Sequence, residues 1–187
     1  FVTNRFTECF QNVIDAYGIA RYRELNPAPL TIVTFPFLFG VMFGDIGHGF
    51  LLFLIALVLV IKEEPLGKIK LPEMVDTLYE GRWLFLLMTM ASMYCGLLYN
   101  EFFGLPMNLF GSDWTYAVPY YKKMFASEAG NYLYPLGVDP LWKGANNELF
   151  YYNSLKMKTS VCMGVVQMLV GIVMSAYNAI YFATSTD

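Results

Sequence analysis

A run of thirty-two residues, Leu30 to Ile61, is almost free of polar side chains. Asp45 and His48, the only histidine of the chain, interrupt this run within the glycine-rich segment 43–49. An ionisable group costs at least ~2.5 kcal/mol at the centre of a membrane helix, so its presence usually marks a polar path or a structural partner. The run therefore predicts a membrane protein and indicates where its function is to be sought.

The composition of the whole chain supports this class. Hydrophobic residues make up 57% of the 187 residues and charged residues only 14%, whereas soluble domains carry about 25% charged residues. This length leaves room for several spans and one large loop, but not for a separate catalytic domain. The net charge of −3, with no basic cluster larger than Lys122–Lys123, argues against binding of nucleic acid. Three scattered cysteines give no disulfide framework. We therefore expect an all-α polytopic membrane protein.

The first segment, residues 1–28, is predicted to be an amphipathic interfacial helix. An apolar stripe at helical spacing runs from Thr3 to about Glu24 and is formed by Phe6, Phe10, Val13, Ile14 and Tyr17. Such a stripe is typical of a helix that lies on the bilayer surface or on a neighbouring protein. The prolines of Asn26–Pro29 end this helix. The segment also lacks the features of a secretory signal, and without an initiator Met the chain is expected to be a piece of a longer polypeptide.

The hydrophobic run itself, residues 29–62, is predicted to be a transmembrane helical hairpin. As one helix it would be ~48 Å long and would need a tilt of roughly 50° to fit a ~30 Å hydrocarbon core. Two short helices, about 29–43 and 46–62, fit better when joined at Gly44–Gly49. Such a turn is tolerated at membrane depth where protein covers it.

Four further segments complete the expected organisation. A polar connector, residues 63–81, leads to a third transmembrane helix, 82–103, and an aromatic loop, 104–157, leads to a fourth, 158–183, with 184–187 at the end. Arginines and lysines in the N-terminal segment and the connector place both in the cytosol, although lysines in the long loop weaken this. The loop lies on the far side, where its aromatic residues favour an ordered fold at the interface; an ordinary small folded insert is an equal alternative.

The positions of Asp45 and His48 allow two interpretations of their role. At positions i and i+3 they share one helical face, where a carboxylate and an imidazole could line a water-filled route for protons. Alternatively, Asp45 caps the second helix of the hairpin and His48 satisfies a buried backbone carbonyl. The residues alone leave both interpretations open.

Three other charged residues belong to the same predicted end of the molecule. A pair between Asp45 and Lys158 or Lys156 would offset the cost of placing either charge near hydrocarbon. Both lysines could instead reach the interface with their long side chains. Glu101, at the end of the third span, either joins this polar cluster or is an ordinary boundary carboxylate.

Small residues predict two helix-packing faces. One is formed by Gly40, Gly44 and Gly47, and the other by Ser160, Gly164, Gly171 and Ser175. Within the fourth span, Gln167 and Asn178 are expected to form interhelical hydrogen bonds. One histidine and unpaired cysteines give no support for a metal site, no nucleophilic constellation is present, and no cofactor is expected.

The motifs resemble those of subunit a of vacuolar-type proton ATPases (V-ATPases). Thr31–Phe37 running into Met42–Gly49, with its Phe-Gly-Asp-x-Gly-His-Gly element, looks like the first membrane hairpin of that family. The further similar segments are Tyr17–Ala20 with Tyr22–Glu24, Ser92–Tyr94 with Leu98–Glu101, and Asn153–Lys158. The resemblance extends over essentially the whole chain.

The resemblance implies a stator fragment of the Vo sector, with no catalysis of its own. In this family subunit a lies beside the proteolipid c-ring, contacts other Vo subunits, connects to the soluble V1 sector through an N-terminal domain, and supplies two half-channels for protons while ATP hydrolysis turns the ring. The far side is then the lumen of an acidified organelle, such as a vacuole, endosome, Golgi compartment or lysosome. The ring-facing arginine of the family is missing, because Arg5, Arg21, Arg23 and Arg82 all lie outside span interiors. Asp45 and Lys158, with His48 and Glu101 behind them, are the proton-path candidates in the lumenal half-channel.

Two other classes remain open at this point. An ion-coupled secondary transporter can also carry a glycine-rich break near a charge, but inverted repeats are not evident between the two halves of the sequence. A purely structural assembly scaffold would use the same residues without any proton path.

Overall fold

The computed structural model describes residues 2–68, 72–112, 116–118, 123–124 and 133–184. Parts of the aromatic loop and the predicted chain end 185–187 therefore lie outside the described residues. Within the described ranges the chain is mostly helical, which agrees with the expected all-α class. Two helices have the length and hydropathy of membrane spans, Arg82–Tyr99 and Glu148–Ala183, and two apolar helices are shorter.

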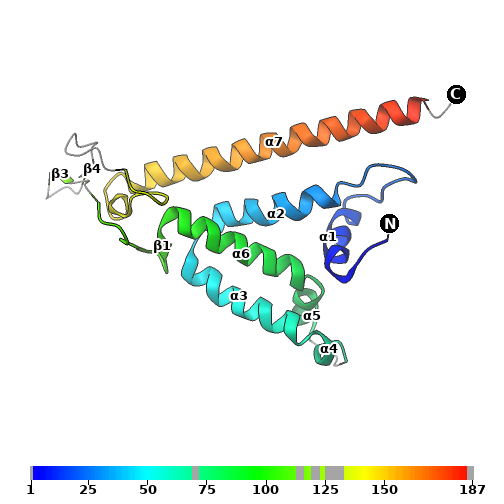
Figure 1. Ribbon diagram of the computed structural model, residues 1–187, viewed down its shortest axis with the longest axis horizontal. Coiled ribbons are helices and arrows are strands. Elements are labelled where there is room, and N and C mark those ends of the chain that lie inside the picture. The colour runs from blue at the N-terminus through cyan, green and yellow to red at the C-terminus, as the bar shows by residue number, and fades with distance from the viewer. Residues whose placement is uncertain (1, 69–71, 113–115, 119–122, 125–132, 185–187) are drawn as a thin grey trace.

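The central unit is a V of two helices with a third packed against both (Figure 1). Helix α2, Ala28–Phe43, and helix α3, Ile46–Ile61, diverge from a turn at Gly44 and Asp45. Helix α6, Arg82–Tyr99, contacts both arms. The turn exists because Gly44 has non-helical dihedrals (φ −53°, ψ 96°) and Asp45 is extended (φ −149°, ψ 127°). The predicted break in the hydrophobic run is thus present at the predicted residues.

Helix α7, Glu148–Thr184, lies beside α2 along the outer edge of the molecule (Figure 1). Its 37 residues correspond to ~55 Å at 1.5 Å per residue. The helix begins ten residues before the expected 158, so the prediction that 148–157 belong to the loop is wrong. The reason is packing: the ring of Tyr151 stacks on Trp142 at 4.3 Å, and Tyr152 is buried. These contacts extend the helix through the aromatic segment that precedes Lys158.

Two other predicted boundaries also differ. Helix α1, Arg5–Asp15, ends well before Glu24, and residues 16–27 form a loop. Helix α6 ends at Tyr99 rather than at 103 because Asn100 adopts the left-handed conformation (φ 52°) and terminates the helix. The next residues form a short hairpin in which β1, Glu101–Phe102, pairs with β2, Leu105–Pro106.

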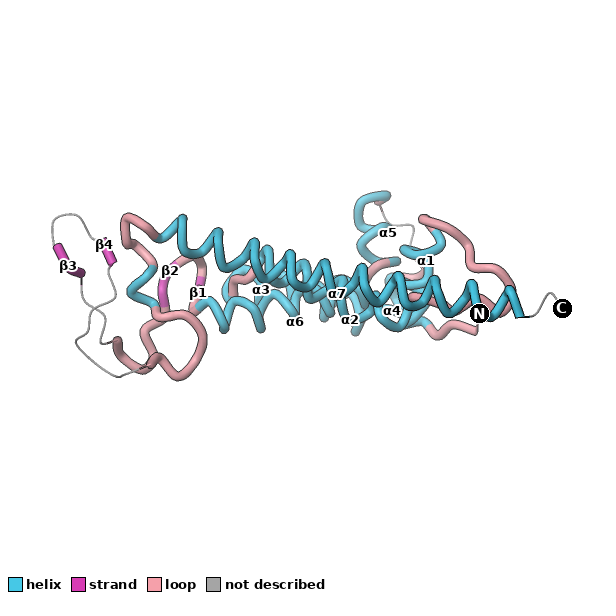
Figure 2. The backbone as a smooth tube through the Cα atoms, turned by 90° about the horizontal axis from the view of Figure 1, so that it is seen from above, coloured by secondary structure: helices cyan, strands magenta, loops and turns pink. Residues whose placement is uncertain are grey.

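The remaining elements are short and lie at the two ends of the molecule (Figure 2). The polar connector contains α4, Glu63–Leu66, and α5, Glu73–Glu80. The long loop contains a strand pair, β3, Tyr116–Val118, with β4, Lys123–Met124, and the 3-10 helix η1, Pro140–Trp142. We call the end with β1 and the start of α7 the far end, and the end with α1 the near end.

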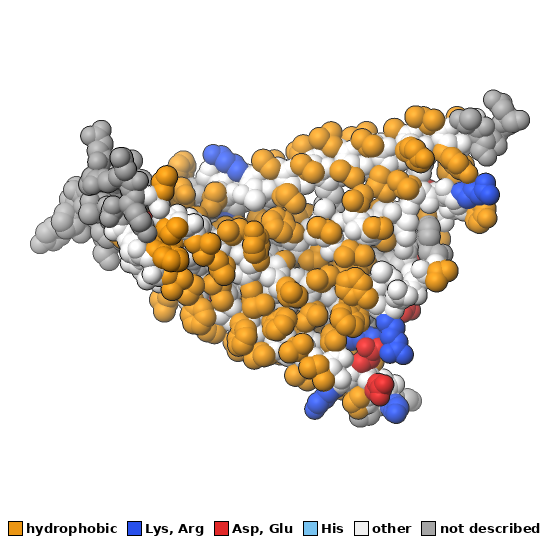
Figure 3. Space-filling model, viewed as in Figure 1, with side chains coloured by type: hydrophobic (Ala, Val, Ile, Leu, Met, Phe, Trp, Pro, Cys, Tyr) orange, Lys and Arg blue, Asp and Glu red, His pale blue; other side chains and the backbone are white. Residues whose placement is uncertain are grey.

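Apolar side chains cover the helices between these two ends (Figure 3). Most charged side chains visible in this view gather at the near end. The buried core of the far end is formed by Val41, Cys95, Tyr99 and Tyr152. Many large apolar residues of α3 and α7 are exposed. Apolar surface of this extent marks contact with lipid or with protein partners.

Candidate functional site

Asp45 occupies the turn between α2 and α3 and uses both carboxylate oxygens. Its Oδ1 accepts the backbone N–H of Gly47 at 2.8 Å, which caps α3. The same oxygen accepts the backbone N–H of Phe103 at 3.0 Å. Its Oδ2 lies 2.6 Å from Nδ1 of His48. The carboxylate therefore joins the start of α3 to the chain that follows α6.

His48 is held by this carboxylate but remains open to the surroundings. Its side chain is 55% exposed, whereas that of Asp45 is 14% exposed. The imidazole also packs edge-on against the ring of Phe103, with ring centroids 5.1 Å apart. Within the described part of the chain, His48 thus pairs with Asp45 and makes no hydrogen bond to a backbone carbonyl. When Nδ1 donates to the carboxylate, Nε2 is left to bind or release a proton.

Glycines allow the turn to approach α6 closely. A Cβ on Gly96 would lie 2.6 Å from the carbonyl carbon of Asp45. A Cβ on Gly44 would lie 2.6 Å from the ring of Tyr99, and one on Gly47 would lie 2.6 Å from the ring of Phe103. Gly40 meets the backbone of Ala91 in the same way. Gly40, Gly44 and Gly47 were predicted to be packing residues, whereas Gly96 was not, although a glycine within an apolar span is a signal of close helix packing.

Glu101 forms a second polar cluster at the far end. One of its carboxylate oxygens pairs with the Lys143 ammonium, and the other lies 3.9 Å from Nζ of Lys156. The three side chains are between 14% and 25% exposed. Nζ of Lys156 also lies 4.9 Å from the centre of the Tyr99 ring, in the range of a cation–π contact. The cluster joins β1, the loop after η1 and the first turns of α7.

The lysines are therefore placed differently from what was expected. Lys156 faces Glu101 rather than Asp45, whose oxygens are taken by His48 and by two backbone N–H groups. Lys158 is exposed and has no ionic partner among the described residues. Lys143 was not predicted to belong to this cluster, because it reaches Glu101 only when the long loop is folded.

The second glycine face is open in the described part of the chain. A Cβ on Gly164 or Gly171 would have no neighbour within 4 Å. Gln167 lines a shallow groove between α2 and α7. Asn178 accepts a hydrogen bond from the backbone N–H of Leu25 at 3.1 Å, which ties the loop after α1 to α7.

The near end has an ionic cluster of its own. Glu63 lies 2.8 Å from Arg82 and 3.0 Å from Arg5. The Arg82 side chain is only 10% exposed. On the same side, the Cys9 thiol donates to the carbonyl of Glu80 at 2.9 Å, and burial raises the pKa of this thiol. These contacts fasten α1 and α4 to the start of α6.

Among the described residues, no group of three or more His, Cys, Asp or Glu side chains could hold a metal ion. The chemistry that the far end can perform is proton exchange at one exposed imidazole, together with electrostatic bracing by shielded ion pairs.

Comparison with known proteins gives a consistent result. Residues 1–187 match the V-type ATPase 116kDa subunit family. The chain is 54% identical over 178 residues to the vacuolar proton translocating ATPase 100 kDa subunit of Dictyostelium discoideum, an alignment that covers 95% of this chain and 22% of that protein. It is 47% identical to V-type proton ATPase subunit a1 of Arabidopsis thaliana, over 100% of this chain and 23% of the relative. It is 45% identical to V-type proton ATPase 116 kDa subunit a 4 of Homo sapiens, over 96% and 24% respectively. The chain thus spans about a quarter of the length of these relatives.

Proposed function

Because this chain belongs to the V-type ATPase 116 kDa subunit family, we propose that it is part of the stator of the Vo sector and supports ATP-driven rotary proton translocation. It acts as a component of that complex and not as an enzyme by itself. Its partners are the proteolipid c-ring, other Vo subunits and the surrounding bilayer, and the longer polypeptide reaches the V1 sector through an N-terminal domain.

The proposed placement in the membrane of an acidified organelle puts the near end in the cytosol and the far end in the lumen. The apolar surface between the two ends supports a transmembrane placement, since most charged side chains in this view lie beyond it at the near end (Figure 3). The positive charges of the near end, Arg5, Arg21, Arg23 and Arg82, follow the positive-inside rule. Asp45, His48, Glu101 and Lys158 then all belong to the lumenal end.

The proposed role of this end is to form part of the wall of the lumenal half-channel. The observation that carries the proposal is the contact between Asp45 and His48: a shielded carboxylate lies 2.6 Å from a half-exposed imidazole. Because the imidazole is exposed beside a carboxylate that holds it in place, we expect His48 to exchange protons at the lumenal surface. Asp45 positions the imidazole, Glu101 braces the loop over α7, and the exposed Lys158 carries a positive charge on the first part of α7.

A purely structural role is the second candidate, and one observation favours it. Both oxygens of Asp45 and both oxygens of Glu101 have partners within the chain. Residues engaged in this way can hold helices together without any contact with a proton.

Access of water to His48 separates the two candidates. In full-length subunit a assembled in proteoliposomes of known orientation, we expect His48→Cys to react with a membrane-impermeant maleimide from the lumenal side. Glu64→Cys, at an exposed connector position, should react only from the opposite side, and Gly164→Cys on α7 should stay unlabelled because lipid surrounds it. Failure of His48→Cys to react from the lumen, with both controls behaving as described, would favour the scaffold.

A further inference from the structure

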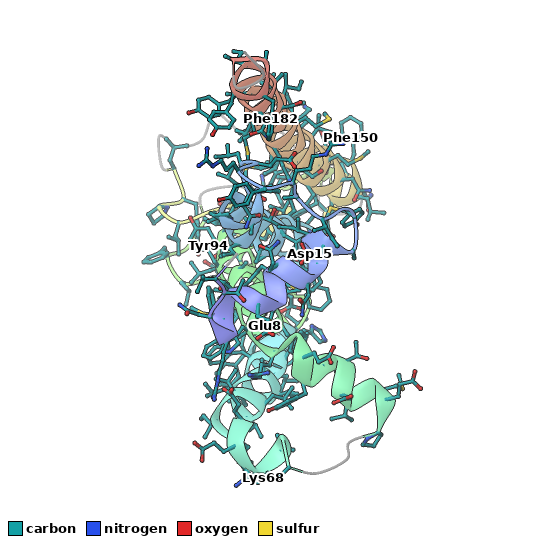
Figure 4. All side chains as sticks on the ribbon, turned by 90° about the vertical axis from the view of Figure 1, so that its right-hand side faces the viewer. Glu8, Asp15, Lys68, Tyr94, Phe150 and Phe182 are labelled. Atoms are coloured by element: carbon teal, nitrogen blue, oxygen red, sulfur yellow. The ribbon has the colours of Figure 1, made fainter. Side chains whose placement is uncertain are left out.

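The near end contains an open pocket of about 610 Å³ between α1 and the loop that follows it. Two carboxylates and two guanidinium groups line it, together with the exposed side chains of Ile19 and Tyr22; the charged residues are Glu8, Asp15, Arg21 and Arg23. Figure 4 shows α1 at this end, with Asp15 between Glu8 and the end of α7 that carries Phe182 in this view. The pocket therefore has equal numbers of positive and negative groups.

Several of these charged side chains have few or no hydrogen-bonding or ionic partners among the described residues. The Glu8 carboxylate and the Arg21 guanidinium have no ionic or hydrogen-bonding partner among the described residues. Asp15 accepts one hydrogen bond, from Gln11 at 2.8 Å. Arg23 donates to the Tyr181 hydroxyl at 3.4 Å. Oppositely charged groups held apart in one pocket are suited to a ligand that carries both signs.

The surroundings of the pocket match those of a membrane interface. Tyr17, Ile19 and Tyr22 are each at least 85% exposed, and aromatic rings beside arginines favour the headgroup level of a bilayer. The same loop is bonded to α7 through Asn178 and Tyr181, close to the end of this long apolar helix.

Deeper along α7 lies the small apolar groove between α2 and α7. Residues at the start of α2 line one side of this groove and residues of α7 line the other. They are Pro27, Leu30, Thr31 and Thr34 on the first side and Val166, Gln167, Val170, Gly171 and Met174 on the second. Val170 is eight residues from Asn178, which is ~12 Å along a helix axis. The groove therefore lies about two helical turns from the position where α7 is bonded to the loop that lines the pocket.

From these observations we propose that the near end binds an aminophospholipid. The phosphodiester is held by Arg21 and Arg23, the headgroup ammonium by Glu8 and Asp15, and an acyl chain enters the groove between α2 and α7. Arginine suits this role because its guanidinium donates two parallel hydrogen bonds to phosphate oxygens. This site requires only that the near end lies at a bilayer surface and is independent of any proton path at the far end.

The test uses the full-length subunit in its assembled complex, reconstituted in nanodiscs with a phosphatidylethanolamine that carries a photoreactive acyl chain. We expect labelling of peptides that contain residues 27–34 and 166–174. In Arg21→Gln/Arg23→Gln this labelling should fall about tenfold relative to that of the lipid-facing helix α3, as expected for the loss of charge-assisted hydrogen bonds to phosphate. Lys68→Gln, which removes a near-end cation far from the pocket (Figure 4), should leave it unchanged.

A second variant tests the ammonium half of the site. Wild-type protein should be labelled more strongly by the phosphatidylethanolamine probe than by a phosphatidic acid probe with the same chain, and Glu8→Gln/Asp15→Asn should remove this preference. Equal labelling of wild type and both double variants would overturn the proposal. So would labelling of residues 27–34 and 166–174 that is no stronger than labelling of helix α3, because the groove would then hold no specific lipid.

Discussion

The backbone N–H of Phe103 donates to Oδ1 of Asp45 at 3.0 Å, across 58 positions of the chain. This bond joins the turn between β1 and β2, which follows α6, to the start of α3, and Asp45 in turn holds the His48 imidazole. In the sequence Asp45 looks like an isolated buried charge. In the folded chain it connects α2 to α3 and holds His48.

Replacing Asp45 by Ala should weaken the junction itself. The variant loses the cap of α3 and leaves the N–H groups of Gly47 and Phe103 without their acceptor. Loss of an N-cap alone costs about 1 kcal/mol, and loss of the hydrogen bond from the Phe103 N–H adds ~0.5–1.5 kcal/mol. We expect a lower melting temperature of subunit a in the membrane complex and less of the subunit assembled. Wild-type assembly of this variant would show that the cap is dispensable.

Gly96→Ala should destabilise the same junction by overpacking. The new Cβ would lie 2.6 Å from the carbonyl carbon of Asp45, and inserting a methyl group against backbone costs ~1–3 kcal/mol. Gly164→Ala is the matched control, because its Cβ has no neighbour within 4 Å and alanine is the better helix former. Protease resistance of the assembled subunit should fall for the first variant only. Equal resistance of both variants would mean that α6 and the turn are not in close contact.

Glu63→Gln should loosen the near end without affecting the far end. It removes the negative charge that faces Arg82, whose side chain is only 10% exposed. Leaving a shielded arginine without its counter-charge should cost about 2 kcal/mol here, less than for a fully buried pair. Glu64→Gln, at an exposed neighbouring position, is the control. Hydrogen exchange at the start of α6 should accelerate for Glu63→Gln alone, and similar exchange in both variants would contradict the assignment.

The Cys9 thiol should react slowly at neutral and mildly alkaline pH. Burial raises its pKa from the ordinary value of 9.0, so less of the reactive thiolate is present. The folded state holds this proton more tightly than the unfolded state, so the associated stability is complete below pH 9 and is lost as the pH rises through the raised pKa. Alkylation measured peptide by peptide should be slower at Cys9 than at Thr3→Cys, an exposed position on the same segment. Equal rates at pH 8 would contradict the buried environment.

The sequence predicted the central features of the fold because they depend on local chemistry. Two short helices in the hydrophobic run follow from bilayer thickness and from the glycine at 44, and a carboxylate at 45 followed by glycine at 47 is a recognisable N-cap. The family resemblance, carried by the same motif, is confirmed by the family match.

The features that were missed depend on contacts between distant segments. Lys143 meets Glu101 only because the loop after η1 folds back, and residues 148–157 become helical because Tyr151 and Tyr152 find partners in the folded protein. The end of α1 was also misplaced, since Tyr17 continues the apolar stripe although it lies in the loop. Periodicity cannot distinguish a continuing helix from an exposed loop at such a position.

The central claim is that Asp45 acts on proton transfer through His48, and Asp45→Asn tests it most directly. Asparagine retains an oxygen that can cap α3 and accept the Phe103 N–H, but it removes the negative charge beside the imidazole. Measured as acidification per assembled complex, proton pumping should fall about fivefold, the factor for loss of ~1 kcal/mol of charge pairing in polar surroundings. The amount of assembled complex should stay near the wild-type level. Unchanged pumping per complex, or a fall that only follows a loss of assembly, would contradict the account and leave Asp45 with a structural role alone.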